Sequence, residues 1–331
     1  TRVSGLRAAA ANGFTGLGLV AWAHEGQLQL SWNFLHSSLG EPEVMRIAGE
    51  LFAEPDPPAS LHAAVLAVAR AYPEVEAVPG LRYAVLARRS AALAARILAV
   101  TGSPGEGQRV GVLASPGADA VVAILAVLRA GAAYVPLDPE WPDARVAEVI
   151  AAARLSALVS TEPGRFPGIE VGSDEAESAS VAAGNLAWVM FTSGSTGAPK
   201  GVEVSHAAAL RWLAWNQGMV GARPGDRVLW TAPLGYGGSI RQVFGPLCSG
   251  GTALPVPPSL RRDPDAMLRF LVDERVNVYN AVPSAWVRLL DAMDRAGATL
   301  PDLRVLVVGG EVMTSAHAAR WLSRVGPRGP R

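Results

Sequence analysis

The sequence predicts an α/β protein in which mostly parallel β-sheets are covered by helices. Short apolar segments that indicate buried strands alternate along the chain with segments of helical composition, and this order favours parallel sheets with helices on both faces. The residues are 50% hydrophobic and 18% charged, so the chain can bury a large core. Its 331 residues are enough for two domains or for one large domain.

The composition excludes several classes of partner. The 29 basic side chains are balanced by 29 acidic ones, so the chain lacks the positive field with which proteins bind nucleic acid. The single cysteine, Cys248, excludes an internal disulfide framework and favours a cytoplasmic protein. No segment has the pattern of a membrane span or a signal peptide. We therefore expect a cytoplasmic protein that binds neither nucleic acid nor membranes, and we predict no protein ligand for a metal.

The first 53 residues have a pattern of their own. Residues 17–35 predict two strands joined at Glu25 and Gly26, because apolar and polar residues alternate from Gln27 to Phe34. Residues 41–52 predict a helix with one apolar face. A hairpin and a single helix cannot bury such a face by themselves. Residues 1–55 are therefore expected either to pack on the following residues or to be the end of another domain.

A proline-rich segment that begins at Glu54 marks the predicted boundary with residues 56–331. In this second region Ser60 is expected to cap a helix over residues 61–72. A strand is expected to pass into a helix near Tyr83. Further strands are predicted to begin near Arg109, Ala132, Ala157, Leu186 and Arg227.

The most informative stretch is a predicted loop over residues 192–201, which joins a buried strand to a helix that begins at His206. The loop contains three glycines, four hydroxyl side chains and Lys200. Glycine lets backbone N–H groups close around an anion, hydroxyls add donors and lysine adds positive charge. The loop is not a Walker A motif, because Pro199 and Gly201 stand where that motif has Gly and Ser/Thr. A phosphate-binding loop is the favoured interpretation, and a Gly/Ser-rich surface loop is the alternative.

Two segments carry a resemblance to a known family. FTSGSTGAPKGV resembles the phosphate-loop signature of the acyl-adenylate-forming superfamily, which includes nonribosomal peptide synthetase adenylation domains, acyl-CoA ligases and luciferases. VLRAGAAYVPLDPEWPDARV, from Val127, resembles a segment typical of the peptide synthetase branch. The resemblance covers about residues 56–328. It implies the N-terminal core of an adenylation domain, truncated before the C-terminal lid domain, and residues 1–55 resemble a condensation-domain tail or a leader.

The resemblance also implies a reaction, cofactors and partners. A carboxylic acid would react with ATP and Mg²⁺ to give an acyl-adenylate, and a phosphopantetheine thiol on a carrier protein would then take the acyl group. A neighbouring condensation domain and a small MbtH-like accessory protein are further implied partners. By resemblance the catalytic candidates are Thr192 and Lys200. The implied ATP-binding residues are Thr192, Ser193, Gly194, Ser195, Thr196, Gly197, Lys200, Gly309, Gly310 and Glu311.

The implied substrate pocket departs from the family at one position. The family places an aspartate after the residue that corresponds to Tyr236, where it pairs with the α-ammonium group of an amino acid, but this chain has Gly237. A buried ammonium group without a counter-charge is costly. Gly237 therefore favours a hydroxy, keto or aryl acid. The alternatives are an amino acid whose nitrogen meets another group, a degenerate domain and an alignment shifted by one residue. By resemblance, the substrate pocket consists of Tyr236, Gly237, Gly238, Arg241, Asn280, Val307 and Gly309.

Two of these pocket residues have open roles. Arg241 would bind a second carboxylate or a keto oxygen, or it would point to solvent. Asn280 would bond a substrate hydroxyl, or it would serve as a turn former.

Several motifs of the family do not follow Glu311. We find no YGPTE-like segment, no ribose-binding aspartate and no lid domain with its catalytic lysine. The 331 residues alone are therefore expected to adenylate poorly or not at all. A stand-alone acyl-CoA or acyl-ACP ligase fragment and a non-catalytic core that serves docking are the competing interpretations.

Overall fold

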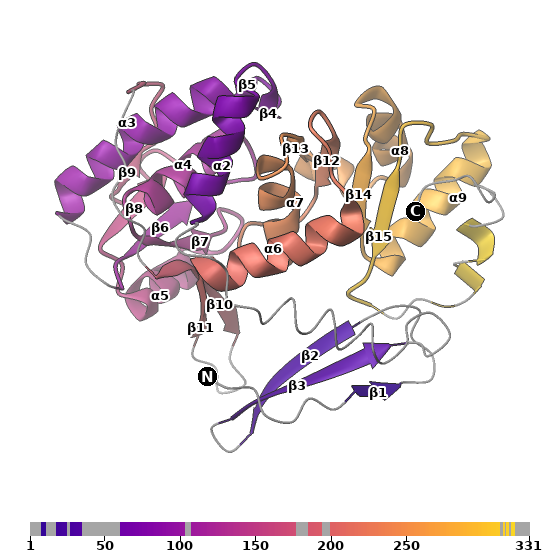
Figure 1. The fold of residues 1–331 in the computed structure, drawn as a ribbon, viewed down its shortest axis with the longest axis horizontal. Helices are drawn as coiled ribbons and strands as arrows, with labels where there is room; N and C mark the ends of the chain where they lie inside the picture. The colour runs from indigo at the N-terminus through magenta and orange to yellow at the C-terminus, as the bar shows by residue number, and fades with distance from the viewer. Residues whose placement is uncertain are drawn as a thin grey trace.

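The computed structural model describes residues 8–10, 18–24, 27–34, 60–102, 107–176, 185–193 and 199–311, together with 314, 316–317 and 319–321. Two sheets, each covered by helices, form the main body of these residues (Figure 1). The predicted α/β class is therefore confirmed. None of the described helices combines the length and the apolar character that crossing a bilayer requires.

The larger sheet has six strands in the order β11-β10-β7-β6-β8-β9. All neighbours in it are parallel except β10 and β11. The strands are β6 (Arg109–Leu113), β7 (Ala133–Leu137), β8 (Ala157–Ser160), β9 (Ile169–Glu170), β10 (Leu186–Ser193) and β11 (Pro199–Ser205).

The smaller sheet has four strands in the order β13-β12-β14-β15, and all of its pairs are parallel. Its strands are β12 (Arg227–Trp230), β13 (Thr252–Pro255), β14 (Val278–Ala281) and β15 (Val305–Val308). Because the strands are parallel, their carboxyl ends meet at one edge, and this edge is where open α/β sheets place their ligands.

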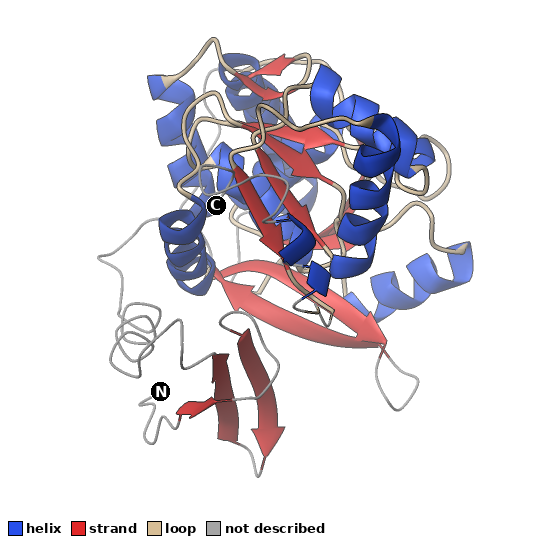
Figure 2. Cartoon of the chain, turned by 90° about the vertical axis from the view of Figure 1, so that its right-hand side faces the viewer, coloured by secondary structure: helices blue, strands red, loops and turns tan. Residues whose placement is uncertain are grey.

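Helices lie on both sides of the core strands (Figure 2). They are α2 (Leu61–Ala71), α3 (Tyr83–Thr101), α4 (Ala118–Arg129), α5 (Asp143–Ala153), α6 (His206–Val220), α7 (Gly238–Leu247), α8 (Pro264–Asp273) and α9 (Pro283–Ala296). A short hairpin of β4 (Glu76–Val78) and β5 (Leu81–Arg82) precedes α3, and a 3-10 turn, η1 (Pro258–Leu260), follows β13. The predicted cap is confirmed, because the Ser60 hydroxyl accepts a hydrogen bond from the Ala63 N–H at 3.2 Å.

The strands of the larger sheet alternate between two cores. In β7, Tyr134 faces the core that also contains α3 and α4, whereas Val135 faces the core that contains Val146 and Val149 of α5. Such alternation follows from the period of two along a strand. Tyr83 links this body to the smaller sheet, because its hydroxyl donates to the Gly251 carbonyl at 2.7 Å.

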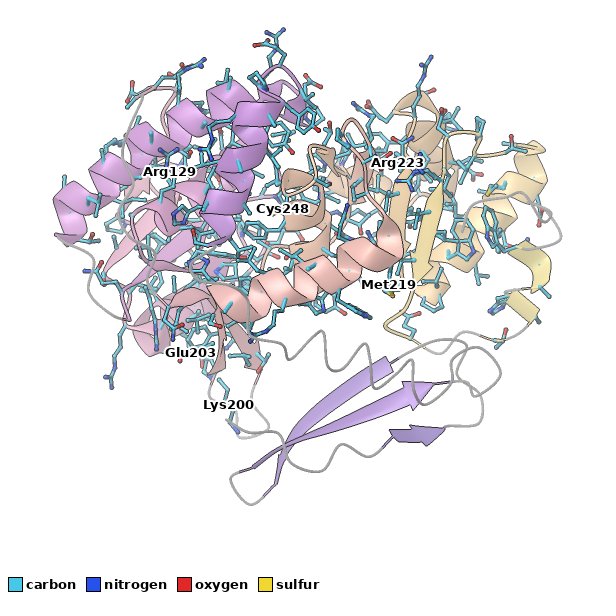
Figure 3. The ribbon with its side chains drawn as sticks, viewed as in Figure 1. Arg129, Lys200, Glu203, Met219, Arg223 and Cys248 are labelled. Carbon is cyan, nitrogen blue, oxygen red and sulfur yellow. The ribbon has the colours of Figure 1, made fainter. Side chains whose placement is uncertain are left out.

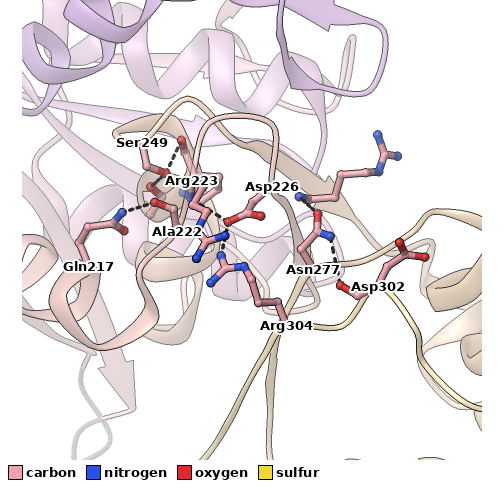
Figure 4. Close-up of polar contacts among 11 residues, drawn as sticks. Gln217, Ala222, Arg223, Asp226, Ser249, Asn277, Asp302 and Arg304 are labelled. Atoms are coloured by element: carbon pink, nitrogen blue, oxygen red, sulfur yellow. Dashed lines mark hydrogen bonds and ion pairs between the residues drawn. The ribbon is translucent and has the colours of Figure 1, made fainter. Parts of the chain in front are cut away.

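Polar contacts join the amino ends of the strands in the smaller sheet (Figure 4). The Asp226 carboxylate accepts from the Arg223 N–H at 2.7 Å and pairs with Arg304. The Asn277 side chain accepts from the Arg227 N–H at 2.8 Å and donates to the Asp302 carbonyl at 3.1 Å. The loops before β12, β14 and β15 are therefore held together. We call this end of the four-stranded sheet its amino edge.

The predicted N-terminal hairpin is confirmed as β2 (Gly18–His24) paired antiparallel with β3 (Gln27–Phe34). The sequence did not predict the short strand β1 (Ala8–Ala10), which pairs parallel with β3. The helix predicted over residues 41–52 lies outside the described residues.

The expectation that the glycine-rich loop runs directly into α6 was wrong. The two ends of the predicted loop belong to strands: Thr192 and Ser193 end β10, and residues 199–201 begin the edge strand β11, which is antiparallel to β10. Helix α6 begins only after β11, at His206. An edge strand with two solvated sides has no buried face to mark it, and Val202 is 52% exposed.

The spacing of Leu210, Leu213 and Ala214 in the sequence predicts one buried face for α6, and this prediction was partly wrong. Leu213 is buried, but Ala214 is exposed and Leu210 is only partly buried. The buried face contains two polar residues, His206 and Asn216. The His206 ring accepts a hydrogen bond from the Leu61 N–H at 3.2 Å. Hydrophobic periodicity assigns polar residues to the solvent and therefore misplaces this face.

Candidate functional site

The hairpin of β10 and β11 carries the two catalytic candidates. Thr192 and Lys200 are opposite each other in the ladder, and the Thr192 hydroxyl contacts the Lys200 carbonyl at 3.5 Å. Both residues are exposed. Figure 3 shows the Lys200 side chain at the end of this hairpin, directed away from the sheet. The predicted ATP-binding residues Gly194, Ser195, Thr196 and Gly197 lie outside the described residues, and Ser193 is described only as the last residue of β10.

Gly201 has a structural reason to be glycine. A Cβ atom there would lie 3.0 Å from Val189 and 3.1 Å from the Phe191 ring. The residue that follows Lys200 must therefore be small for β11 to lie against β10.

Helix α7 presents a stripe of accessible residues that includes three of the predicted pocket residues. Its opposite face is buried through Ile240, Val243, Phe244 and Leu247. The accessible stripe consists of Gly237, Gly238, Arg241 and Gly245. Gly237 already has helical backbone angles, and a Cβ atom at this position would meet nothing within 4 Å. The start of α7 is therefore open on this side.

Gly238 and Tyr236 are close together at the beginning of α7. A Cβ atom at Gly238 would lie 3.0 Å from the Tyr236 ring, so glycine allows the ring to cross the first turn. Tyr236 is 58% exposed. Its phenol and the start of α7 therefore face the same open side.

Gln242 fixes α7 to the carboxyl ends of two strands, and the sequence did not predict this role. Its side-chain oxygen accepts from the N–H groups of Thr231 and Ala232 at 3.0 and 2.9 Å. Its side-chain nitrogen donates to the Thr231 hydroxyl at 3.2 Å and to the Asn280 carbonyl at 3.4 Å. A long polar side chain on the mostly apolar buried face of α7 was the available signal.

The predicted pocket residues that lie on strands are neighbours at the carboxyl edge of the smaller sheet. Asn280 of β14 is paired with Val307 of β15, and the Gly309 N–H donates to the Ala281 carbonyl at 3.1 Å. Asn280 is only 7% exposed, and its side-chain oxygen has no hydrogen-bond partner among the described residues. An unsatisfied buried acceptor of this kind is uncommon in folded proteins.

Arg241 is the second unpartnered polar group at this edge. Its Nε atom is buried, and within the described ranges the side chain makes no hydrogen bond and no ion pair. Burial lowers the pKa of Arg241, and the neighbouring Tyr236 offsets part of that shift. The guanidinium group is therefore partly desolvated without an acidic partner.

The last predicted residues form a turn after β15. Gly310 has a φ of +93°, in the left-handed region that favours glycine. The Glu311 carboxylate then accepts from the N–H and the hydroxyl of Ser284, both at 3.0 Å. It lies at the amino end of α9, where a negative charge is favourable. The structure thus gives Glu311 a capping contact that the sequence did not predict.

The structure therefore groups the candidates in two places. Residues of α7, β14 and β15 meet at the carboxyl edge of the smaller sheet, while Thr192 and Lys200 lie on the hairpin of the larger sheet. Within the described ranges, no group of three or more His, Cys, Asp or Glu side chains could hold a metal ion.

Sequence comparison finds known proteins that are similar to this chain. Two similar proteins are syringomycin synthase SyrB1 of Pseudomonas syringae pv. syringae and AMB antimetabolite synthetase AmbE of Pseudomonas aeruginosa. SyrB1 is 34% identical over 295 residues, which cover 83% of this chain and 47% of SyrB1. AmbE is 37% identical over 292 residues, which cover 81% of this chain and 14% of AmbE. The chain thus spans less than half the length of these relatives.

Solved structures and a family model identify the fold. The nonribosomal peptide synthetase FmoA3 superposes with a TM-score of 0.74 at 25% identity, over 93% of this chain and 39% of FmoA3. Its AMPPNP-bound form gives a TM-score of 0.73 at 26% identity over the same shares of the two chains. The family model described as "AMP-binding enzyme" matches residues 66–330. The chain therefore belongs to the AMP-binding enzyme family and has the fold of a nonribosomal peptide synthetase adenylation core.

Proposed function

We propose that this chain is part of a nonribosomal peptide synthetase adenylation domain that activates a carboxylic acid as acyl-AMP with Mg-ATP. The observation that carries the proposal is the group of residues from α7, β14 and β15 at the carboxyl edge of a parallel sheet, with two unpartnered polar side chains. Ligands of open α/β sheets bind at this edge. A carrier protein with a phosphopantetheine thiol is the proposed acceptor, and residues 1–55 are the proposed end of a condensation domain.

The β10–β11 hairpin fits the phosphates of ATP. Thr192 and Lys200 are exposed at the end of this hairpin, where they supply a hydroxyl donor and a positive charge. When bound, ATP supplies the adenylyl group and Mg²⁺ neutralises phosphate charge. The task of the protein in such a displacement is to position the groups and to stabilise charge. Lys200 would do the second by facing the phosphate oxygens.

We further propose that the acid lacks an α-ammonium group. Gly237 brings no carboxylate to the first turn of α7 and leaves open space there. The neighbouring acidic side chain of the β15 turn, Glu311, is already bonded to Ser284. A substrate ammonium group at this place would lie near the positively charged Arg241 and would be disfavoured by like-charge repulsion.

Carboxylate-dependent ATP–pyrophosphate exchange by the full-length protein tests this function. The panel contains amino acids beside hydroxy, keto and aryl acids of matched carbon skeleton. We expect exchange with an acid that lacks the amino group. Exchange with ordinary amino acids alone would contradict the proposal about Gly237. Absence of exchange with every acid would contradict the proposed activity and favour a docking role.

Acceptor choice is a separate measurement. The proposal predicts transfer of the acyl group to a phosphopantetheine carrier protein in preference to free CoA. Preferential acylation of CoA would instead identify an acyl-CoA ligase.

A further inference from the structure

We infer that Arg241 receives a second carboxylate of the substrate, so that the acid activated by this site is a dicarboxylic acid. This inference rests on the proposed function and names the substrate class of the same site. It starts from the unpartnered guanidinium group on α7.

Two other partly buried arginines near the smaller sheet have an acidic partner. Arg304 pairs with Asp226 and Arg227 pairs with Glu274. Within the described part of the chain, no carboxylate contacts Arg241 or contributes to its pKa; the ionisable neighbour that does so is Tyr236. A desolvated cation without an anion is unfavourable for stability, so its retention points to an anion that arrives with the ligand.

The direction of the side chain supports the same conclusion. In a helix the Cα–Cβ bonds tilt toward the amino terminus, so a side chain covers the turn that precedes it. Arg241 is four residues after Gly237 and three after Gly238, so it lies on the same face as these glycines, one turn later. Its electrostatic interaction with Tyr236, which precedes both glycines, agrees with this direction.

The two glycines leave this space without side chains of their own. A Cβ atom at Gly237 meets nothing within 4 Å. The space that an acidic side chain at position 237 would fill is therefore open, and the nearest charge on the helix face is positive. The positive end of the α7 dipole lies at the same turn. Together these features change the preferred substrate group from a cation to an anion.

Arginine suits a carboxylate in particular. Its planar guanidinium group presents paired N–H donors that match the two oxygens of a carboxylate. One carboxylate of the acid would be adenylated while the other is held by Arg241.

The test compares dicarboxylic acids with monocarboxylic acids of the same chain length. We would measure pyrophosphate exchange by the full-length protein with four-, five- and six-carbon members of each series. The wild-type protein should prefer the dicarboxylic series by about 10- to 100-fold in kcat/KM. Arg241→Ala should abolish this ratio, mainly through KM. Arg241→Lys should keep part of it, because lysine retains the charge but not the paired donors.

Arg261 provides a matched control. Its Nε atom is also buried without a partner among the described residues, but it lines a different cavity of about 200 Å³ together with Asp138 and Glu140. Arg261→Ala should leave the ratio of dicarboxylic to monocarboxylic exchange unchanged. If Arg261→Ala and Arg241→Ala lowered this ratio equally, the inference would be wrong.

A binding measurement separates this inference from the proposed activity. Succinate and butanoate are added to the full-length protein, and the shift of Tm is recorded for wild type and Arg241→Ala. Stabilisation by succinate that Arg241→Ala removes would support the inference even if no exchange is detected. Exchange with monocarboxylic acids alone, unchanged by Arg241→Ala, would overturn the inference and leave the proposed activity intact.

Discussion

The two edges of the four-stranded sheet differ in whether their partly buried arginines have an acidic partner. At the amino edge, Asp226 is paired with Arg304, and both ends of the Asn277 side chain are bonded. At the carboxyl edge, Arg241 and the Asn280 side-chain oxygen have no partner among the described residues. Unpaired buried polar groups lower stability. This difference supports a stabilising role for the amino edge and our proposal that the carboxyl edge binds a ligand.

Loss of the Asp226 carboxylate should remove the contacts that connect the loops at the amino edge. Asp226→Ala leaves Arg304 without its acid and the Arg223 N–H without its acceptor. We expect the free energy of unfolding to fall by about 3 kcal/mol, measured by urea unfolding. Asp302→Ala is the control, because the contact of Asp302 with Asn277 uses only its backbone carbonyl. A similar loss in both variants would show that the ion pair is not the stabilising element.

Low pH should weaken the buried hydrogen bond between Leu61 and His206 at the start of α6. The other end of this helix lies near the amino edge (Figure 4). His206 accepts from the Leu61 N–H, and its ring lies 6.0 Å from that of His62. Burial lowers the pKa of His206 to about 4; burial also lowers that of His62 to about 4, with contributions from His206 and Arg129.

Because the unfolded chain binds a proton more tightly, stability should be highest above about pH 6.5 and fall as the pH drops toward 4. For His206 alone the loss between pH 7 and pH 5 is about 2 kcal/mol. His206→Asn keeps an acceptor for Leu61 but does not titrate, so its unfolding free energy should depend less on pH. Equal pH profiles for the two proteins would refute this assignment.

Gln242 belongs to the carboxyl edge but acts as a positioning residue. Gln242→Ala removes the contacts with Thr231, Ala232 and the Asn280 carbonyl. We expect a loss of about 1 to 2 kcal/mol in unfolding free energy and a larger KM for the acid. Gln242→Glu keeps the two acceptor contacts and should restore part of the affinity. A changed kcat with an unchanged KM would argue against positioning.

Arg241→Met should have the smallest effect on stability, and it should raise the free energy of unfolding rather than lower it. Arg241→Met removes an unpaired, partly buried cation and keeps an apolar stem of similar length. Its unfolding free energy should equal that of wild type or exceed it by up to about 1 kcal/mol. A loss as large as that of Asp226→Ala would show that Arg241 has a structural partner, and the contrast between the two edges would disappear.

The sequence predicted elements whose signals are local. The Ser60 cap and the β10 strand were predicted because a hydroxyl before an apolar helix and a short apolar run have direct physical meanings. The β11 strand was not predicted, because an exposed edge strand lacks a buried face. The face of α6 was misplaced because His206 and Asn216 are buried polar residues.

The candidate site also contains residues that the sequence predicted and contacts that it did not. The pocket residues were assigned from the resemblance, and the structure brings those of α7, β14 and β15 to one edge. The contacts of Gln242 and the bond from Ser284 to Glu311 could not be predicted. Both join residues whose proximity depends on the packing of separate elements. The absence of a partner for Arg241 likewise required the surrounding structure.

The most direct test is the acid preference of the wild-type protein and of Gly237→Asp. The new carboxylate has room and lies one turn before Arg241, where it would pair with the guanidinium group. We would measure kcat/KM in pyrophosphate exchange for an α-amino acid and for the matched α-hydroxy acid. We predict that wild type prefers the hydroxy acid and that Gly237→Asp moves the ratio toward the amino acid by about tenfold or more. A wild-type preference for the amino acid, or a ratio unaffected by the substitution, would contradict this prediction.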